Sequence, residues 1–460
     1  MEPRLTAPPP DDWIGPLDRA DRTGGPIHAR IVAALEDAVA RGVLRPGERL
    51  PTQRALAGRL GVDLTTVTRA YNEARHRGLI DAVTGRGSFI AGGAAFSAPA
   101  MDLSMNMPPP PHGMKLGELI ERGLSGLLAR SNADVLMAYH VGPGAPQDRL
   151  AAARWLEPTL GPVSTSRLMV LPGAQGALAS LLSLLTRPGD TLLAERETYP
   201  GLIAAAARLG VKVAGVACDG EGLRPDALLA ACHAGTARLL YLQPALQNPT
   251  TATMGAQRRA EIARIARARN LTMIEDDPYS RLMDAPLAAF ATLLPEATYH
   301  VATLAKTLTP GLRTAYVAVP EGQTTDALAQ AMRALALMPA PLMTALATRW
   351  ISTGTATHLL GAIRHEARAR QEMARALLPE GAIAAPEGLH VWQKLPAHWD
   401  RGRLTAAARR RGLAVTPADA FCVEGTPSPA LRLSLGAVAD RARLGEALAA
   451  LAALIGGTAD

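Results

Sequence analysis

Apolar positions near the amino terminus recur every three or four residues, as they do on one face of a helix. This spacing predicts a helix that ends at Gly42, a second short helix with Thr52 as its N-cap, and a third helix after Gly61. Two short alternating apolar runs follow, and the glycines between them are typical of a hairpin turn. The expected elements are helices over about 27–41, 53–60 and 63–77 and strands over 79–83 and 88–90.

The pattern changes further along the chain, where short continuous apolar runs alternate with stretches of helical spacing. Such alternation indicates an α/β fold, in which helices cover both faces of a mainly parallel sheet. From Pro339 onward, long helical stretches and weaker strands indicate a smaller α+β domain. The strand candidates are 168–171, 191–194, 211–216, 238–242, 271–274, 301–304 and 315–319.

A proline-rich segment from Ala94 to His112 separates the two patterns and includes four consecutive prolines at 108–111. Such a stretch favours extended polyproline geometry and acts as a semi-rigid spacer. We therefore expect a multidomain chain. Its parts are a flexible amino-terminal tail over 1–23, an α+β domain over 24–93, a linker over 94–113 and an α/β domain over 114–460, with a large sheet within about 160–335 and a small α+β domain within about 336–460.

Composition narrows the class of protein. Apolar residues make up 48% of the chain and the mean hydropathy is near zero, as in soluble globular proteins. No run of eighteen apolar residues and no apolar secretory signal is present, so we expect a cytoplasmic protein with no membrane partner. The three cysteines are scattered and the histidines lack ligand spacing, so neither a disulfide framework nor a metal site is expected.

The segment 24–95 is basic, since ten arginines stand against six acidic residues. A helix fits the major groove of DNA and a hairpin wing can reach the neighbouring backbone, so this segment suits double-stranded DNA. From the pattern alone, the alternative is a small protein-interaction module with a solvated basic face. The candidate DNA contacts are Arg54, Thr65, Thr66, Thr68, Gly85 and Arg86.

Several motifs in this segment are similar to those of the GntR-type winged helix. The longest reads Arg-Gly-Val-Leu-Arg-Pro-Gly-Glu-Arg-Leu-Pro-Thr-Gln-Arg over 41–54, and Gly-Arg-Gly-Ser-Phe-Ile over 85–90 ends the match. The resemblance implies a winged helix-turn-helix that binds DNA. The chain departs from the family at Leu64, where arginine is usual at the start of the recognition helix. This loss of a phosphate or base contact implies an operator that differs from the usual one.

Lysine chemistry has few candidates, because the chain holds only Lys115, Lys212, Lys306 and Lys394. Lys306 follows an apolar strand and precedes a Pro-Gly turn, which places it at a strand end facing a cleft. Asp276 also follows an apolar strand, and a carboxylate there is expensive to bury without a partner, so it is either functional or a capping residue. The turn 173–175 joins a strand to a helix, as phosphate sites often do.

Taken in order, these motifs resemble those of fold-type I aminotransferases from about Met114 to the carboxyl terminus. The resemblance implies pyridoxal 5'-phosphate as the cofactor and Lys306 as the lysine that forms the Schiff base. It implies that Tyr199 stacks on the ring, that Asn248 and Tyr279 face the ring hydroxyl, and that Asp276 pairs with the pyridinium nitrogen. It further implies phosphate ligands, Gly173, Ala174, Gln175, Thr303 and Arg313, and a clamp for the carboxylate of an amino acid, Arg432. Departures occur at Gln243, Thr251 and Ala305, where threonine, glycine and serine are common, but none removes a group that the cofactor needs.

A winged helix followed by an aminotransferase-like domain is the arrangement of the MocR subfamily of GntR regulators. We expect a transcription regulator in which Lys306 holds pyridoxal phosphate as an aldimine, with an amino acid, an amine or the cofactor itself as effector. Two alternatives stay open: a cytosolic aminotransferase with an accessory DNA-binding domain, and a DNA-binding protein whose second domain has lost the cofactor. The resemblance also implies a homodimer, because sites of this fold type usually form between two subunits.

Overall fold

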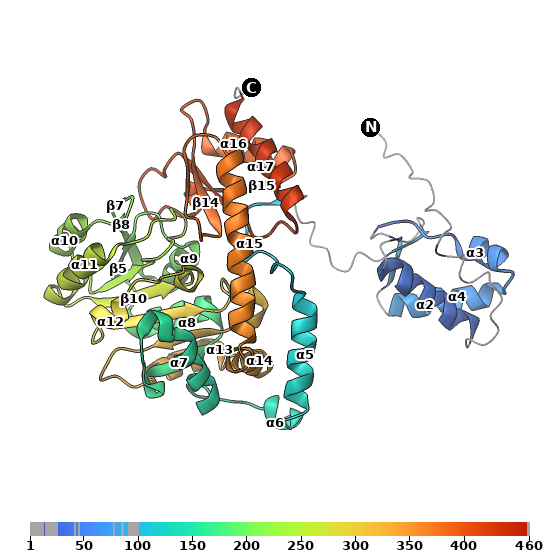
Figure 1. Cartoon of the computed structure of the whole chain (residues 1–460), viewed down its shortest axis with the longest axis horizontal. Helices are drawn as coiled ribbons and strands as arrows, with labels where there is room; N and C mark the ends of the chain where they lie inside the picture. The colour runs from blue at the N-terminus through green and yellow to red at the C-terminus, as the bar shows by residue number, and fades with distance from the viewer. Residues whose placement is uncertain are drawn as a thin grey trace. The chain divides into compact units, whose positions relative to one another are not determined.

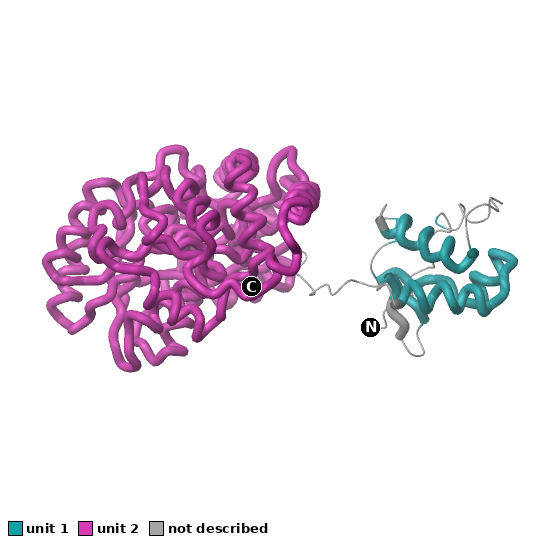
Figure 2. The backbone as a smooth tube through the Cα atoms, turned by 90° about the horizontal axis from the view of Figure 1, so that it is seen from below, with its two compact units in different colours: residues 1–98 teal, residues 99–460 magenta. Residues whose placement is uncertain are grey.

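The computed structural model describes residues 13, 26–40, 43–44, 47–76, 79–83, 87–90 and 101–457. The chain divides into two compact units, Met1–Ala98 and Pro99–Asp460 (Figure 2). Gly85 and Arg86, two of the predicted DNA contacts, lie outside the described residues.

The first unit contains the three helices and the hairpin that the sequence predicts. The hairpin strands are antiparallel, with Ile80 opposite Ile90. Ile31, Val67 and Tyr71 form part of one buried core between the helices. The elements are α2 (Ile27–Ala40), α3 (Gln53–Leu60), α4 (Leu64–His76), β1 (Ile80–Val83) and β2 (Gly87–Ile90).

Local interactions at the helix ends fix the angle between α3 and α4. Thr52 caps α3, because its hydroxyl accepts a hydrogen bond from the Ala55 amide at 3.2 Å. Gly61 ends α3 in the left-handed region with φ of 61°. Asp63 then caps α4 by accepting a hydrogen bond from the Thr65 amide at 2.7 Å. A polar cap, a glycine and a second polar cap thus produce the short turn that the sequence predicts.

The second unit is built on a seven-stranded sheet whose order is β4-β12-β11-β10-β9-β5-β6 (Figure 1). All neighbouring pairs are parallel except those of β12, which runs antiparallel to β11 and β4. All seven strand candidates form this sheet. The strands are β4 (Leu168–Leu171), β5 (Thr191–Glu195), β6 (Lys212–Val216), β9 (Leu239–Leu242), β10 (Thr272–Asp277), β11 (Thr298–Thr303) and β12 (Ala315–Ala318).

Helices cover both faces of the sheet. Along β9, Leu239 and Tyr241 contribute to the apolar core that also contains α8 (Gly173–Leu185), α9 (Pro200–Arg208) and α13 (Asp326–Ala336). Leu240 and Leu242 contribute to the core with α10 (Pro225–Ala234), α11 (Ala256–Ala268) and α12 (Phe290–Leu293). Successive side chains of a strand point to opposite faces, so a continuous apolar run is what a doubly covered strand requires.

A four-stranded antiparallel sheet forms the smaller part of this unit. Its order is β13-β14-β17-β16, and α16 and α17 pack on it. The helix α15 spans 23 residues and joins this part to the large one (Figure 1), since its Leu359 packs in the large core and its Ala374 in the small one. The elements are α15 (Thr355–Leu377), β13 (Ala382–Ala384), β14 (His390–Lys394), α16 (Arg401–Arg410), β15 (Leu413–Ala414), β16 (Thr416–Pro417), β17 (Ala430–Ser434) and α17 (Arg441–Gly456).

The boundary predicted near 336 lies earlier than the division between the two cores. Leu346 and Trp350 of α14 pack in the large core, because α14 lies against α5 and α7. Helical spacing shows that a face is buried but not which neighbour buries it. The remaining elements are α5 (Leu116–Leu128), α6 (Ala133–Leu136), α7 (Pro146–Leu160), β7 (Cys218–Asp219), β8 (Gly222–Leu223), α14 (Pro341–Ser352) and short 3-10 turns at Thr165–Arg167, Ser280–Leu282, Pro310–Leu312 and Ala418–Ala420.

The second part of the predicted spacer 94–113 is packed on the second unit. Strand β3 (Met101–Asp102) pairs in parallel with β15, and Leu103 is fully buried in the small core. The chain then lies so close to Gly436 that a Cβ there would be 1.7 Å from the Met107 carbonyl oxygen. Proline content therefore identified an extended segment but not its burial. Within the described part of the chain, no helix is both long and apolar enough to cross a membrane.

Candidate functional site

A cavity of about 190 Å³ lies where the parallel strands end and the small sheet begins. Ligand sites of open α/β sheets lie outside the carboxyl ends of their strands, so this position agrees with the fold. Ten of the residues predicted to hold a cofactor or carboxylate line this one cavity: Ala174, Gln175, Tyr199, Asn248, Asp276, Tyr279, Thr303, Lys306, Arg313 and Arg432. The cavity is also lined by residues that the sequence did not assign: Met105, Asn106, Gln243, Pro278 and Ala305.

Lys306 is a half-buried lysine whose amine lies at this cavity. It follows β11 closely, and its Nζ donates a hydrogen bond to the Asn106 carbonyl oxygen. Burial lowers the pKa of Lys306 to about 8, and the positive charge of Arg432 adds to the effect. A larger fraction of this amine is therefore neutral, and thus nucleophilic, at neutral pH.

Asp276 is a buried carboxylate with one oxygen engaged and one without a partner. Oδ2 accepts hydrogen bonds from the Tyr241 hydroxyl at 2.6 Å and from Gln243 Nε2 at 2.8 Å. Oδ1 has no hydrogen-bond partner among the described residues. Burial raises the pKa of Asp276 to about 6, although the bonds from Tyr241 and Gln243 act in the opposite direction. A buried acceptor without a partner is costly, which indicates that a ligand donor belongs there.

The end of the cavity at the amino terminus of α8 is suited to an anion. The first amides of a helix have no intrahelical partners, and no side chain caps those of α8. Gly173 has φ of 79°, and a Cβ there would lie 3.1 Å from the Arg313 guanidinium, so glycine permits this close approach. Helix amides together with a guanidinium form a common phosphate site. Thr303, which also lines the cavity, ends β11.

The ring of Tyr199 packs directly on Gly201, where there is no room for a side chain. A Cβ at residue 201 would lie 2.4 Å from the Tyr199 ring and 2.2 Å from Gln175 Oε1. Gln175 Nε2 in turn donates to the Gly201 carbonyl at 2.8 Å. Burial raises the pKa of Tyr199, and the charge of Asp276 adds to this, so the phenol stays neutral. The sequence assigned Tyr199 but not the glycine that lets the ring approach the cavity.

Arg432 enters from β17 of the small sheet. Its Nη1 donates to Asn248 Oδ1 at 3.1 Å, and its Nη2 donates to the Ser104 carbonyl oxygen. The guanidinium lies 5.0 Å from the centre of the Phe421 ring, within cation–π distance. Burial lowers the pKa of Arg432 to about 10, which leaves the side chain charged at neutral pH. A buried cation whose contacts among the described residues are with neutral groups suits an anionic ligand.

Asn106 joins the two halves of the site and was not predicted. Its Nδ2 donates to the Tyr279 hydroxyl at 2.9 Å and to His390 Nδ1 at 3.3 Å. His390 Nε2 must be the protonated nitrogen, because it contacts the Gln247 carbonyl oxygen at 3.1 Å. Burial lowers the pKa of His390 to about 3, so the ring is neutral. The polyproline pattern hid Asn106, and a polar residue between two methionines carries no sequence signal of its own.

Gln243, which stands where the family usually has threonine, holds two site residues together. While Nε2 contacts Asp276, Oε1 accepts a hydrogen bond from the Asn248 amide at 3.2 Å. The other departure, Thr251, has φ of 64° in the left-handed region. Glycine adopts this region freely and a β-branched residue does not, which explains why glycine is usual there.

The predicted DNA contacts that fall among the described residues lie on α3 and α4. Arg54 and Thr65 are exposed, and Thr66 and Thr68 are half-buried. Two hydroxyls are already engaged: Thr65 donates to Asp63 Oδ1 at 2.6 Å, and Thr68 donates to Gln53 Oε1 at 2.9 Å. The four residues remain predicted contacts, with the guanidinium of Arg54 as the one full positive charge among them.

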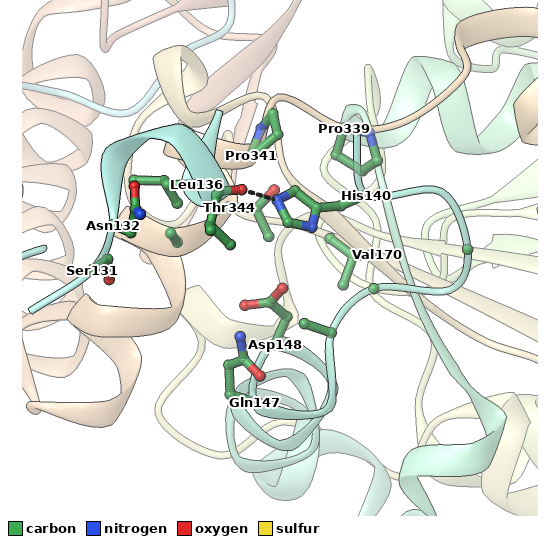
Figure 3. Close-up of a pocket in the computed structure, with 15 residues that line it drawn as sticks. Ser131, Asn132, Leu136, His140, Gln147, Asp148, Val170, Pro339, Pro341 and Thr344 are labelled. Carbon is green, nitrogen blue, oxygen red and sulfur yellow. Dashed lines mark hydrogen bonds between the residues drawn. The ribbon is translucent and has the colours of Figure 1, made fainter. Parts of the chain in front are cut away.

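A second cavity, of about 350 Å³, lies between α6, α7 and α14. His140, Asp148 and Thr344 contribute polar atoms to it, and His140 Nε2 contacts the Val135 carbonyl at 2.8 Å (Figure 3). None of the predicted site residues lines this cavity. Size alone therefore does not identify the site, whereas the convergence of chemically matched side chains does.

Pyridoxal phosphate fits the first cavity on three structural observations. The unpartnered Asp276 Oδ1 offers an acceptor for a protonated ring nitrogen. The uncapped α8 terminus beside Arg313 offers a phosphate cradle. Lys306 offers an amine of lowered pKa at the same cavity. These groups are the ones that this cofactor requires of a protein.

Comparisons with known proteins match both units. Residues 27–90 match the model of the bacterial regulatory proteins of the gntR family, and residues 99–451 match that of aminotransferase class I and II. The uncharacterized HTH-type transcriptional regulator YdeF of Bacillus subtilis strain 168 is 29% identical over 437 residues, covering 93% of each chain. The vitamin B6 salvage pathway transcriptional repressor PtsJ of Salmonella typhimurium is 29% identical over 430 residues, covering 90% of this chain and 96% of that protein.

Solved structures agree with the fold of the second unit. The α-aminoadipate aminotransferase LysN of Thermus thermophilus superposes with a TM-score of 0.71 at 24% identity, covering 84% of this chain and 98% of that one. Membership in this family implies pyridoxal phosphate as the cofactor. The chain belongs to the aminotransferase class I and II family and carries a gntR-family domain before it, which is the domain combination of the MocR subfamily.

Proposed function

We propose that this protein is a transcription regulator that binds double-stranded DNA through α3 and α4 and binds pyridoxal phosphate at Lys306. The main support is that one chain contains both a helix pair suited to DNA and a cavity suited to pyridoxal phosphate. A capped helix pair exposes Arg54, while a separate unit brings Lys306, Asp276 and Arg432 to one cavity. Two relatives that match over nine-tenths of the chain are named as transcriptional regulators.

Each residue has a definable task. When bound, pyridoxal phosphate supplies an aldehyde that condenses with a primary amine and releases water. Lys306 is the amine of this chain, and burial keeps a useful fraction of it unprotonated. Asp276 would hold the ring nitrogen through Oδ1, while Tyr241 and Gln243 fix the carboxylate through Oδ2.

The effector is an amino acid, an amine or pyridoxal phosphate itself. Arg432 favours a ligand that has a carboxylate, because guanidinium binds carboxylates with two parallel hydrogen bonds. The name of PtsJ concerns vitamin B6 salvage, which supports the cofactor itself as a second candidate. For either ligand to regulate, its affinity must differ between two states of the protein.

The direct test is a footprint on the DNA upstream of the protein's own gene. It would be recorded with no ligand, with pyridoxal phosphate, and with pyridoxal phosphate plus a panel of amino acids and amines. We expect a protected site whose occupancy changes with at least one ligand, and no such change in Lys306→Ala. A footprint that no ligand alters would contradict the sensor role.

A pyridoxal-phosphate aminotransferase is the second candidate function, because the cavity retains both a lysine of lowered pKa and a carboxylate-binding arginine. Turnover assays with amino acid and keto acid pairs separate the two functions. Rapid turnover without any ligand effect on DNA binding would favour the enzyme. A chain that takes up no cofactor, with no absorbance change that depends on Lys306, would instead favour a domain that lost its cofactor.

A homodimer is part of the proposal. Val135, Met137, Tyr139 and Val141 are between 49% and 76% exposed on one short segment. Exposed apolar side chains clustered in this way mark association surfaces. A second copy is the proposed partner, because two winged helices bind the two half-sites of an operator with matching symmetry. Such a regulator acts in the compartment that holds the DNA, which in a bacterium is the cytoplasm.

A further inference from the structure

A buried histidine lies on the face of the large sheet opposite the cofactor cavity. His300 of β11 stands directly beside Glu275 of β10 in the parallel pair. Successive side chains of a strand point to opposite faces, so Glu275 and Asp277 share the face of His300, whereas Asp276 points to the other face. His300 is fully buried and does not line the cavity. It therefore acts on the site, if at all, through β10.

The two carboxylates next to His300 are both ionised. Glu275 accepts hydrogen bonds from two backbone amides at the start of α12, at 2.9 and 3.1 Å. Burial opposes its charge, but the bond with His300 and these other contacts lower the pKa of Glu275. Asp277 accepts hydrogen bonds from the Ser280 amide at 2.9 Å and from the Ser280 hydroxyl. Carboxylates that accept several hydrogen bonds are stabilised in the charged form.

The geometry around His300 favours a doubly protonated ring. Nδ1 lies 3.1 Å from Glu275 Oε2, and Nε2 lies 3.6 Å from Asp277 Oδ2. A neutral imidazole carries one N–H, so either tautomer would direct a bare nitrogen at a carboxylate. The imidazolium instead directs an N–H at each of the two acids. Burial opposes this charge, but the hydrogen bond with Glu275 and the charges of Glu275 and Asp277 raise the pKa of His300.

The other neighbours of this group do not take over the role of His300. Arg259 of α11 is a second cation, but its Nη1 lies 3.9 Å from Glu275 Oε1, and its N–H groups bond to three backbone carbonyls. On β12, the residue opposite His300 is the uncharged Ala318. Three consecutive acids thus end β10, and His300 is the cation that contacts both of those that flank Asp276.

The charges on this face reach the carboxylate on the other. Burial raises the pKa of Asp276 to about 6, and the charge of Asp277 adds to the rise, whereas the charge of His300 opposes it. A protonated ring nitrogen needs an ionised acceptor, and Asp276 Oδ1 is the acceptor that has no partner among the described residues. The charge of His300 therefore favours the form of Asp276 that the cofactor requires.

We propose that His300 is a positioning residue for the cofactor: its charge, shared between Glu275 and Asp277, keeps Asp276 ionised and thus able to hold a protonated ring nitrogen. His300 does so from behind the sheet and touches no ligand. This inference rests on the proposed binding of pyridoxal phosphate, and it does not depend on DNA binding.

His300→Gln tests the charge, because glutamine retains a donor for Glu275 but is neutral. Fluorescence titration of the full-length protein with pyridoxal phosphate would be repeated between about pH 5 and pH 9. Without the nearby positive charge, Asp276 binds its proton more readily, so its pKa rises. We expect the pH below which affinity falls to move up by about one unit. An unchanged pH limit, or an affinity lowered by the same factor at every pH, would overturn the inference.

Two further variants serve as controls. His300→Gln/Asp277→Asn removes one positive and one negative charge, and asparagine keeps an acceptor for the Ser280 amide. We expect the pH limit to return to within about 0.3 units of the wild type, because the two losses compensate. A double variant displaced as far as His300→Gln would show a structural role instead. His233→Gln, which removes an exposed histidine of α10, should leave the limit unchanged.

An analogue of the cofactor locates the effect at the ring nitrogen. In 1-deazapyridoxal phosphate a C–H group replaces this nitrogen, so its binding does not need an ionised Asp276. On acidification, His300→Gln should then lose no more affinity for the analogue than the wild type does. An equal loss with the analogue and with pyridoxal phosphate would place the effect elsewhere and overturn the inference.

Neutron diffraction from the wild type tests the charge of His300 without any variant that has to fold. At about pH 7 an ordinary histidine, with a pKa of about 6.5, is mostly neutral. We expect hydrogen on both ring nitrogens of His300 at this pH. A single ring hydrogen would overturn the inference.

The outcomes separate this inference from the proposed function. If the wild type takes up no pyridoxal phosphate, the cofactor role and the role of His300 both fail. If the wild type binds the cofactor and His300→Gln keeps the same pH limit, the cofactor role stands and the role of His300 is wrong. The footprint on DNA tests the sensor role separately.

Discussion

Lys306 differs from the other lysines in how little solvent reaches it. Burial removes the water that would stabilise its charge, and Arg432 adds repulsion, so its pKa falls to about 8. Lys115, by contrast, is 83% exposed and pairs with Glu118. Chemistry at the cavity therefore depends on one amine whose charge is controlled by its surroundings.

The uptake of pyridoxal phosphate should report this pKa. At pH 7 a lysine of pKa about 8 is roughly 300 times more often neutral than one of pKa about 10.5. The uptake rate should follow the neutral fraction of Lys306, because only the neutral amine is nucleophilic. This fraction rises with pH and approaches one above the pKa, so the rate should level off above about pH 8. Stopped-flow absorbance measures this rate. Lys115→Ala should leave the profile unchanged, and a rate that still rises up to pH 10 would show an ordinary lysine.

Gln243→Leu should weaken cofactor binding. It removes a donor to Asp276 and the acceptor of the Asn248 amide, and such a loss in a buried site costs about 1–3 kcal/mol, or roughly 5–150-fold in Kd. The pKa of Asp276 should rise further above about 6, so the acidic limit of binding should move to higher pH. Fluorescence titration measures both effects. Gln393→Leu, a buried glutamine of the small sheet, is the control and should leave the Kd unaltered.

At the scale of elements, the regular pattern of the chain was predictable and the contacts across elements were not. All seven strands of the large sheet follow from apolar runs such as 239–242, whose four side chains are all buried. Thr52 and Gly61 marked the ends of α3, since cap chemistry is local. The roles of Asn106 and His390 at the site were not predicted, because these residues contact partners far away in the sequence.

The sequence motifs predicted which side chains line the cavity, but only the three-dimensional structure shows which residues hold them in place. Lys306, Asp276 and Arg432 stand at motif positions, and all three line the cavity. Their hydrogen-bond partners do not follow from spacing: Gln243 was noted only as a departure, although it fixes Asp276. A family pattern can name the groups that touch a cofactor but not the side chains that hold those groups in place.

Leu64→Arg should strengthen DNA binding by α4. Leu64 is 39% exposed at the start of this helix, where an arginine would reach a phosphate. Each added phosphate contact steepens the dependence of log K on log salt by about 0.9. Fluorescence anisotropy across a salt series measures this slope. Leu64→Ala should leave the slope as in the wild type, and an unchanged slope in Leu64→Arg would place this helix end away from the phosphates.

At the scale of the whole molecule, the apolar segment around Val135 and Met137 should hold two copies together. Two aspartates in Val135→Asp/Met137→Asp would be buried without partners in such an interface, which costs several kcal/mol. We expect the double variant to be monomeric at micromolar concentration by light scattering. Leu229→Asp, on the exposed face of α10, is the control and should stay dimeric. A double variant with the mass of the wild type would place the interface elsewhere.

Leu103 has a consequence for where this protein can be divided. Its side chain is fully buried in the small core, eleven residues before the start of the domain that the proline run suggests. A chain shortened to begin at residue 114 would leave a hole in that core and strip Asn106 from the cavity. A DNA-binding domain exchanged by recombination or by engineering should therefore be joined before Met101. The proline run 108–111 then stays with the pyridoxal-phosphate-binding unit.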